Sequence, residues 1–178
     1  MTPILLAGPA VEPVTLAEMR AYLRLDDEAE DGLVSALIGA ARLLVEAASG
    51  RILVEQSWRL VIDRWPRSRI VAPPFSPLIA VEGVRVERGG GDPGVEGVRL
   101  LGEDRLLVDP AVPDPLPARE GIEIDLRAGY GGPEAVPPPL VQAIRVLVAR
   151  WFENRGETEI ALPADLGPLV LPFRRARL

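Results

Sequence analysis

Cysteine, histidine and lysine are absent from this sequence. The chain therefore has no thiolate nucleophile, no imidazole base and no lysine for Schiff-base chemistry, and it lacks the nitrogen and sulfur ligands of most transition-metal sites. Carboxylates, hydroxyls, two tyrosines and guanidinium groups remain available for catalysis. Most familiar catalytic sites are excluded, and so is a disulfide framework.

Positive charge is also in short supply. All 20 basic residues are arginine and stand against 26 acidic residues, so the formal net charge is −6. A general nucleic-acid-binding protein presents a basic face, and this charge balance argues against that class. The opening MTPILLAGPAV lacks the charged region of a signal peptide, and no uninterrupted apolar run approaches about 18 residues. We therefore expect a protein without a membrane span that is made and kept in the cytoplasm.

Aromatic residues are scarce, with three Trp, two Tyr and three Phe among 178 residues. The apolar fraction of 48% is that of a globular protein, so aliphatic side chains must form most of its core. A chain of this length fits one domain with a sizeable core.

Three segments have the apolar spacing of helices. The first begins with a capping box, in which Thr15 and Glu18 can each accept a hydrogen bond from the other's backbone amide. The second ends at Gly50, a residue typical of helix C-caps. The third follows a run of prolines and has a wide apolar face. We predict helices over residues of about 15–25, 29–49 and 138–155.

The stretch from about 51 to 132 has a period of two instead, which is the mark of strands. Ile122 and Ile124, for example, alternate with Glu123 and Asp125. Such half-buried strands predict an antiparallel sheet with one wet face. Proline- and glycine-rich turns separate the strands, at 89–94 and 109–117 among others.

This order of elements predicts an α+β fold: a small helical bundle of three main helices with an antiparallel β insertion between the second and third helices. Residues 1–156 would form the single domain. Residues 157–178 contain three prolines and no clear periodicity, and we expect them to form an extended C-terminal tail that docks on another protein. The alternative that this segment folds back on its own domain stays open.

Five acidic residues lie between Asp26 and Asp31, at the head of the second helix. Clustered carboxylates suit a divalent cation, although the spacing of an EF-hand loop is missing. Acidic residues are equally expected at a helix N-terminus because of its partial positive charge. A carboxylate-based, metal-dependent hydrolase is the corresponding enzyme hypothesis. Its candidate residues would be Asp26, Asp27, Glu30 and Asp31, or Asp104 with Asp109.

The glycine-rich stretch Ala128–Gly132 stands before a helix and raises the question of a phosphate-binding loop. Such a loop needs backbone amides at the helix N-terminus, and Pro137, Pro138 and Pro139 have none to offer. We interpret the glycines as the turn by which the last strand leaves the sheet.

Several motifs together resemble the head–tail connector (adaptor) family of tailed phages and phage-like gene transfer agents. They cover nearly the whole chain, and their order and spacing are more specific than any one of them. They are VTLAE at 14–18 with YLR at 22–24, the acidic stretch 26–31, QSWRL at 56–60, AGYG at 128–131, and PPPL at 137–140 through WFENR at 151–155.

The resemblance implies a structural, non-enzymatic protein without metal or cofactor. Such adaptors form a homo-oligomeric ring, usually of twelve subunits, beneath the portal, where they extend the DNA channel and carry the stopper and tail. Double-stranded DNA would pass through the ring without sequence-specific binding. The location would be the neck of a virion or gene transfer agent particle assembled in the bacterial cytoplasm. Another neck component, such as a stopper or tail-completion protein, is the alternative.

Two sets of residues acquire roles from this resemblance. The C-terminal segment would bind the portal protein through Leu169, Leu171, Phe173, Arg174, Arg175 and Arg177. The acidic residues Asp26, Asp27, Glu30 and Asp31 would face the channel or cap their helix. The loops at 89–94 and 109–117 depart from the family pattern and receive no contact.

Overall fold

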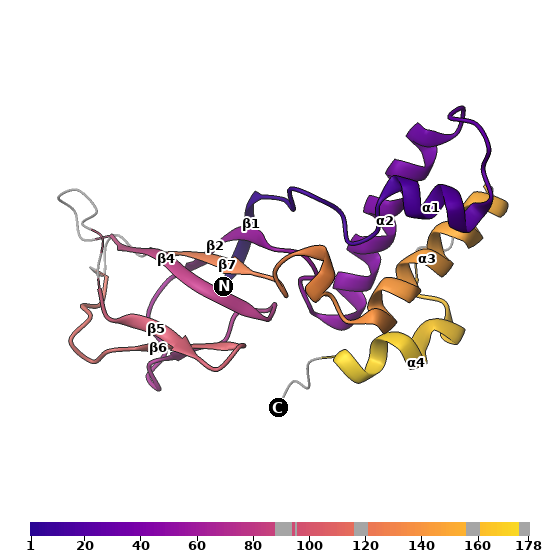
Figure 1. Cartoon of the computed structure of the whole chain (residues 1–178). Coiled ribbons are helices and arrows are strands. Elements are labelled where there is room, and N and C mark those ends of the chain that lie inside the picture. The colour runs from indigo at the N-terminus through magenta and orange to yellow at the C-terminus, as the bar shows by residue number, and fades with distance from the viewer. Residues whose placement is uncertain (88–93, 95, 116–120, 156–160, 175–178) are drawn as a thin grey trace. The chain divides into compact units, whose positions relative to one another are not determined.

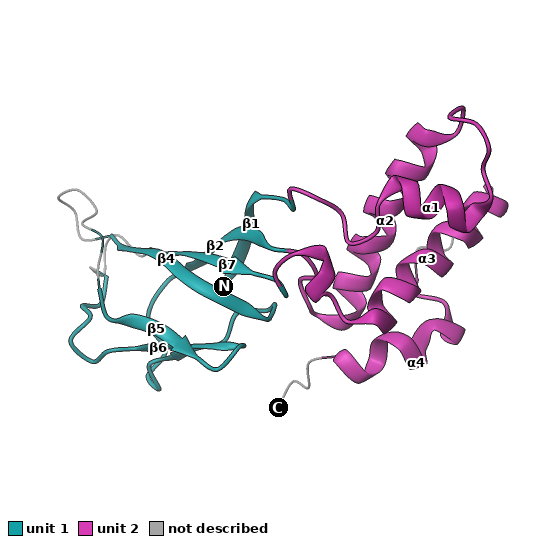
Figure 2. Ribbon diagram, in the orientation of Figure 1, with its two compact units in different colours: residues 1–9, 55–130 teal, residues 10–54, 131–178 magenta. Residues whose placement is uncertain are grey.

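The computed structural model of the chain describes residues 1–87, 94, 96–115, 121–155 and 161–174 (Figure 1). The chain divides into two compact units (Figure 2). Unit 1 consists of Met1–Pro9 and Glu55–Tyr130 and holds the strands, whereas unit 2 consists of Ala10–Val54 and Gly131–Leu178 and holds the helices. The predicted α+β class is confirmed.

The described residues of unit 1 form two antiparallel sheets. The larger sheet has the strand order β1-β2-β7-β4 and the smaller one β3-β6-β5. The strands of the larger sheet are β1 (Thr2–Ala7), β2 (Gln56–Ile62), β4 (Leu78–Val86) and β7 (Ile122–Ala128). Those of the smaller sheet are β3 (Ile70–Val71), β5 (Val98–Leu101) and β6 (Arg105–Val108).

The alternation along β7 decides which face of the larger sheet is buried. Ile122, Ile124 and Leu126 are at most 1% exposed, while the residues between them are half-buried. Leu106 and Val108 on β6 are fully buried as well. Apolar side chains of both sheets therefore form the core of unit 1, and the prediction of one buried and one wet face holds for β7.

Strand β1 was not predicted. It pairs antiparallel with β2, with Ile4 opposite Arg59 and Leu5 opposite Trp58, and it forms one edge of the larger sheet. Its sequence TPILLA has no alternation of apolar and polar residues, and all six residues are exposed. Pairing with a strand far along the chain determines β1, and a local pattern cannot report such pairing.

The described residues of unit 2 form four α-helices and three short 3₁₀ helices. The α-helices are α1 (Leu16–Leu23), α2 (Asp31–Ser49), α3 (Pro138–Glu153) and α4 (Gly167–Val170). The 3₁₀ helices are η1 (Pro133–Ala135), η2 (Ala164–Leu166) and η3 (Leu171–Phe173). The three long helices fall where the sequence predicts them, with ends that differ by one or two residues.

Local capping explains where α1 begins and where α1 and α2 end, whereas Glu30, which precedes α2, forms no side-chain capping hydrogen bond. Thr15 Oγ1 accepts a hydrogen bond from the amide of Glu18 at 3.2 Å, and Glu18 Oε2 accepts one from the amide of Thr15 at 2.8 Å. This is the predicted capping box. Helix α1 ends at Leu23 because Arg24 adopts the left-handed conformation, with φ of 57°. Gly50 ends α2 in the same conformation, with φ of 69°.

Helix α2 is the core helix of unit 2. By length and composition it is apolar enough to cross a membrane, with a mean hydropathy of 1.5 over its best window. Val34, Ala41 and Val45 are fully buried against the rest of the unit, however. The core helix of a globular domain passes the same test, and the buried stripe explains the hydropathy.

The C-terminal segment differs from the extended tail that the sequence suggests. Residues 164–173 form η2, α4 and η3. Leu166 and Val170, which are four residues apart and so lie on one face, are both buried. The prolines do not prevent this, because Pro168 and Pro172 stand in the first turn of their short helices, where the missing amide costs nothing. The extended-tail prediction is therefore wrong for 164–173, while 156–160 and 175–178 lie outside the described residues.

Candidate interaction surfaces

Hydrogen bonds from Arg51 and Arg150 hold the C-terminal segment to the rest of unit 2. Arg51 Nε donates a hydrogen bond to the carbonyl of Phe173 at 2.9 Å. Arg150 donates two hydrogen bonds to the Asp165 carboxylate, at 2.6 and 3.2 Å. These bonds from Arg150 hold the pKa of Asp165 below its usual range. These contacts fix the segment near Asp165 and at Phe173, and Val170 between these two residues is fully buried.

The portal-binding residues predicted from the resemblance divide into three groups. Leu171 is 55% exposed and Arg174 is exposed as well. Leu169 and Phe173 are half-buried within unit 2. Arg175 and Arg177 lie outside the described residues. Leu171 and Arg174 are consequently the members of the set that the described structure leaves most available to a partner.

The acidic residues at the start of α2 differ in their contacts and exposure. Asp31 accepts a hydrogen bond from Arg20 at 3.4 Å, and Glu30 accepts one from Arg155 at 2.8 Å. Asp27 accepts a bond from the amide of Ala29 at 3.0 Å. Asp26 and Asp27 are exposed and form no ion pair with another described residue. The two ends of the run thus differ, with ion pairs at Glu30 and Asp31 and exposed carboxylates at Asp26 and Asp27.

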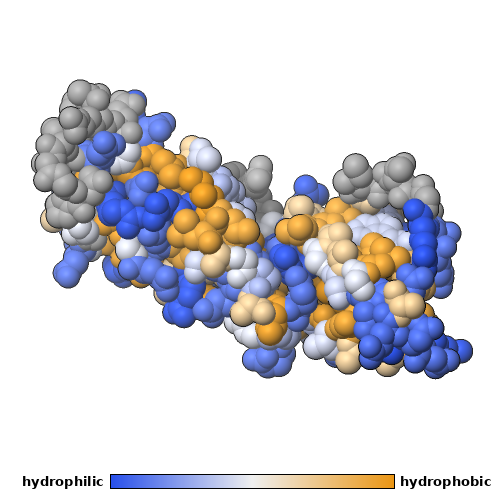
Figure 3. All heavy atoms as spheres, turned by 90° about the horizontal axis from the view of Figure 1, so that it is seen from above, coloured by the Kyte–Doolittle hydropathy of each residue, from blue (hydrophilic) through white to orange (hydrophobic). Residues whose placement is uncertain are grey.

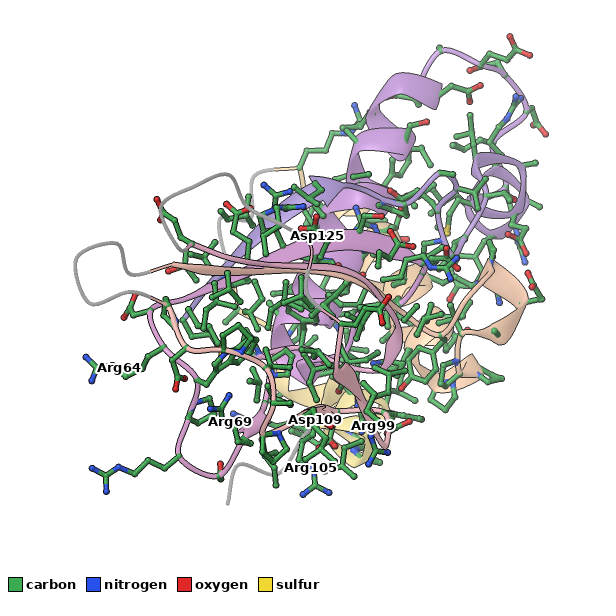
Figure 4. All side chains as sticks on the ribbon, turned by 90° about the vertical axis from the view of Figure 1, so that its left-hand side faces the viewer. Arg64, Arg69, Arg99, Arg105, Asp109 and Asp125 are labelled. Carbon is green, nitrogen blue, oxygen red and sulfur yellow. The ribbon has the colours of Figure 1, made fainter. Side chains whose placement is uncertain are left out.

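Asp104 and Asp109, the other candidate residues of the hydrolase hypothesis, do not form a carboxylate pair. Asp104 and Asp109 stand at opposite ends of β6, and a strand rises about 3.3 Å per residue. Asp104 forms an ion pair with Arg105 at 3.3 Å, and Asp109 accepts a hydrogen bond from the amide of Ala111 at 2.8 Å. Figure 4 labels Asp109 and the arginines of this region. Among the described residues, no group of three or more acidic side chains is placed to hold a metal ion.

The wet face of the larger sheet carries a ladder of charges. The carboxylate of Asp125 on β7 accepts a hydrogen bond from Arg59 Nε on β2 at 2.7 Å and one from Arg85 Nη2 on β4 at 2.9 Å. Asp125 is labelled in Figure 4. Both arginines also pair with Glu123, at 3.2 and 2.9 Å. The hydrogen bond from Arg59 is the main cause that holds the pKa of Asp125 below its usual range, and partial burial opposes it.

The predicted alternation placed Glu123 and Asp125 on one face of their strand but did not pair them with Arg59 and Arg85. The pairing depends on the strand order β2-β7-β4, which places Arg59 and Arg85 on opposite sides of Asp125. Alternation along a strand shows which face of the sheet a side chain lies on, but it does not show which strand lies next to it. The pairing of these charges is therefore known only from the order of the strands.

A second charge network is buried in unit 2. Arg42 on α2 donates to Glu12 at 2.8 Å and to Glu46 at 2.9 Å, and its side chain is only 10% exposed. Glu46, 7% exposed, also accepts the amide of Leu53 at 2.9 Å. The network ties α2 to the segments before and after it. The four-residue spacing of Arg42 and Glu46 was the available sequence signal.

The turn after β7 has the geometry expected of an exit from the sheet. Gly129 and Gly131 have φ values of 130° and 116°, a region that side-chain-bearing residues rarely adopt. The amide of Gly129 donates to the carbonyl of Pro77 at 2.9 Å, so this donor is already used within unit 1. The interpretation of the glycines as a turn is confirmed.

Comparison with known proteins gives matches among solved structures. No protein-family model and no curated protein matches the sequence. A chain from the neck of an empty gene transfer agent particle, computed with C6 symmetry, superposes with a TM-score of 0.87 at 26% identity. The match covers 100% of this chain and 97% of that one.

Two further solved chains agree with this match. One comes from the virion of a native gene transfer agent particle, with a TM-score of 0.85 at 26% identity, again over 100% of this chain and 97% of that one. The other comes from the neck of a native particle computed with C12 symmetry, with a TM-score of 0.75 at 27% identity over 98% and 97%. These full-length similarities confirm the resemblance found in the sequence and support a location in the virion.

Proposed function

We propose that this chain, a member of the phage-like neck and connector proteins, is an adaptor that forms a ring beneath the portal of a phage or gene transfer agent particle. The ring extends the DNA channel and carries the stopper and tail. The role is structural and non-enzymatic. The observation that carries this proposal is the similarity over both units to chains from necks computed with six-fold and twelve-fold symmetry.

The charge of the chain is consistent with a DNA channel. A conduit must let DNA slide, and strong phosphate binding would oppose that movement. The net charge is −6, and the described arginines of the wet sheet face are paired with carboxylates. Guanidinium groups that are paired in this way are less available to DNA phosphates.

Binding to portal rings tests the adaptor assignment against the other neck components. The full chain is mixed with isolated portal rings and separated by density-gradient sedimentation. An adaptor should co-sediment with the portal directly. A stopper or tail-completion protein should not do so unless an adaptor is present. Failure to bind portal alone, with binding to portal that carries another neck ring, would reassign the chain.

We place the portal contact on the exposed side of the C-terminal segment, at Leu171 and Arg174. Leu171 offers apolar surface and Arg174 a guanidinium that suits a carboxylate or carbonyl on the portal. Arg175 and Arg177 continue the basic character of the segment. Leu169 and Phe173, which are half-buried in unit 2, would contribute if the segment moves on binding.

Substitution is a better test of this contact than truncation. A chain that ends before Leu169 would also lose the buried Val170 and so damage unit 2. The variant Leu171→Glu removes exposed apolar surface without opening the core, and we expect it to abolish co-sedimentation with portal rings. Tyr22→Glu, at a residue 46% exposed on α1, is the matched control and should bind normally. Normal binding by Leu171→Glu would refute the assignment.

We further propose that Asp26 and Asp27 face the channel, while Glu30 and Asp31 act mainly within their unit. Exposed carboxylates repel DNA phosphates and would keep the channel wall from gripping the duplex. Particles with Asp26→Asn and Asp27→Asn together should assemble but deliver DNA more slowly, and the defect should shrink as salt screens the charges. Unchanged delivery at low salt would contradict this placement.

A further inference from the structure

The N-terminal strand exposes an unusual amount of apolar surface. Of the eight large apolar residues that are most exposed among the described residues, four are Met1, Ile4, Leu5 and Leu6. The last three are 45–49% exposed. No charged side chain occurs before Glu12. We call Ile4, Leu5 and Leu6 the β1 strip.

An open strand edge of this kind is normally protected. Proteins blunt free edges with charged side chains, prolines or bulges, because unpaired backbone groups invite another chain. In β1 the protection consists of Pro3 and one irregularity between Leu5 and Ala7. An uncharged strip with this little protection indicates a surface that a partner covers in the assembled particle.

The other edge of the same sheet cannot be that partner. Strand β4 has two register irregularities, and its ends are already engaged within unit 1. Arg85 forms an isolated bridge with Gly94, and the amide of Leu78 donates to the carbonyl of Glu103 at 2.7 Å. These features disfavour pairing of β1 with β4 of another copy.

The outer face of α2 is a second uncharged surface. Leu43 is 58% exposed and stands in a stripe of exposed residues without charge. The members of this α2 face are Gly32, Ser35, Ala36, Ala40, Leu43 and Ala47. Apart from Leu43 its side chains are small, so the face is shallow and lets another element approach closely. Figure 3 shows hydrophobic patches interspersed with hydrophilic surface.

We infer that, in the proposed ring, the β1 strip of one copy packs against the α2 face of the next copy. The inference rests on the proposed function. A ring of identical copies is closed by a heterologous interface, which joins two different surfaces of the same chain. The β1 strip and the α2 face meet this requirement, one in each unit.

The chemistry of the two surfaces is complementary. Neither carries a charge, so their contact desolvates no ion. Successive side chains of a strand point to opposite faces, so Ile4 and Leu6 flank one side of the free edge and Leu5 the other. At this edge the branched side chains would meet the small residues of the helix face. Three of the other exposed large apolar residues stand near charges in the sequence. Val11 precedes Glu12, Tyr22 lies between Arg20 and Arg24, and Leu171 precedes Arg174 by three residues.

Because the chain has no native cysteine, introduced cysteines test this contact cleanly. Two single variants of the full chain, Leu5→Cys and Leu43→Cys, are mixed, assembled on portal rings and treated with a short thiol-to-thiol crosslinker. We expect covalent dimers in the mixture and none with either variant alone. In the double variant, linkage should proceed around the ring and give a ladder of covalent multimers. Tyr22→Cys mixed with Leu43→Cys is the control and should remain monomeric.

Charge substitution supplies an independent readout. Leu5→Glu and Leu43→Glu alter exposed residues, so the monomer should keep its thermal unfolding curve while the ring is lost. Two outcomes would overturn the inference and leave the proposed function standing. In one, rings form but the mixed variants Leu5→Cys and Leu43→Cys are not crosslinked. In the other, two copies of the Leu5→Cys variant are crosslinked to each other. Absence of any ring with the unaltered chain would overturn both.

Discussion

The two units use the same chemistry, arginine paired with carboxylate, in opposite environments. In unit 1, Arg59 and Arg85 meet Asp125 on a sheet face where their side chains are 28% and 32% exposed. In unit 2, Arg42 meets Glu46 where both side chains are at most 10% exposed. Water stabilises the first set of charges when a partner is lost, but it reaches the second set far less. The contribution of an ion pair to stability is therefore set by its burial.

The largest expected effect of breaking this contrast is in unit 2. Arg42→Met removes the cation between Glu12 and Glu46, and the buried Glu46 carboxylate loses the compensating charge of Arg42. The free energy of unfolding should fall by about 3–5 kcal/mol, measured by urea denaturation. Adding Glu46→Gln should restore much of the loss, because glutamine keeps an acceptor for the amide of Leu53. A loss no larger than that of Arg85→Met would contradict the contrast.

A smaller effect is expected on the sheet face. Asp125→Asn removes the carboxylate that Arg59 and Arg85 share, and the free energy of unfolding should fall by about 1 kcal/mol. The same urea experiment gives the value. Asp104→Asn, at an exposed ion pair on the smaller sheet, is the control and should change stability less. If Asp125→Asn lowered the free energy of unfolding as much as Arg42→Met, the ion pairs of the sheet face could not be the weak, solvent-screened pairs described above.

The pH dependence of stability sharpens the comparison. The pKa of Asp125 is lowered in the folded protein, chiefly by the hydrogen bond from Arg59. A lowered folded-state pKa means that the stabilisation is complete above the unfolded-state pKa and is lost as pH falls through the folded-state pKa. The urea midpoint of the parent chain should therefore decrease through the acid range, and Asp125→Asn should flatten that decrease. Parallel curves for the two proteins would contradict this.

The smallest expected effect is at the start of α1. The pKa of Glu18 is lowered mainly by the hydrogen bond from the backbone amide of Thr15. Glu18→Gln keeps the capping geometry but removes the charge, and it should cost about 0.5 kcal/mol at neutral pH. The difference between the two proteins should vanish when Glu18 is protonated at low pH. A difference that persists there would point to a cause other than charge.

Much of the fold was predictable from the sequence, because its signals are local. The capping box at Thr15 and the left-handed C-cap at Gly50 depend on neighbouring residues, and both occur where predicted. The α+β class and the buried face of β7 follow from periods of 3.6 and 2. These features require no knowledge of distant contacts.

The missed features depend on partners far along the chain. Strand β1 exists because β2 pairs with it, and the charge ladder exists because β7 lies between β2 and β4. The C-terminal helices were missed for a different reason. Proline usually ends helices, but Pro168 and Pro172 occupy first-turn positions, where it is favoured, and the spacing of Leu166 and Val170 was the usable signal.

The central claim, that this chain forms a ring in the particle neck, is tested most directly by counting its copies. Portal rings are saturated with the full chain, and the mass of the complex is measured by native mass spectrometry. The account predicts that the added mass corresponds to one closed set of copies, twelve on a twelve-fold portal, with no stable partial sets. Binding of single copies in a graded series, or no binding to portal or to any other neck ring, would contradict it.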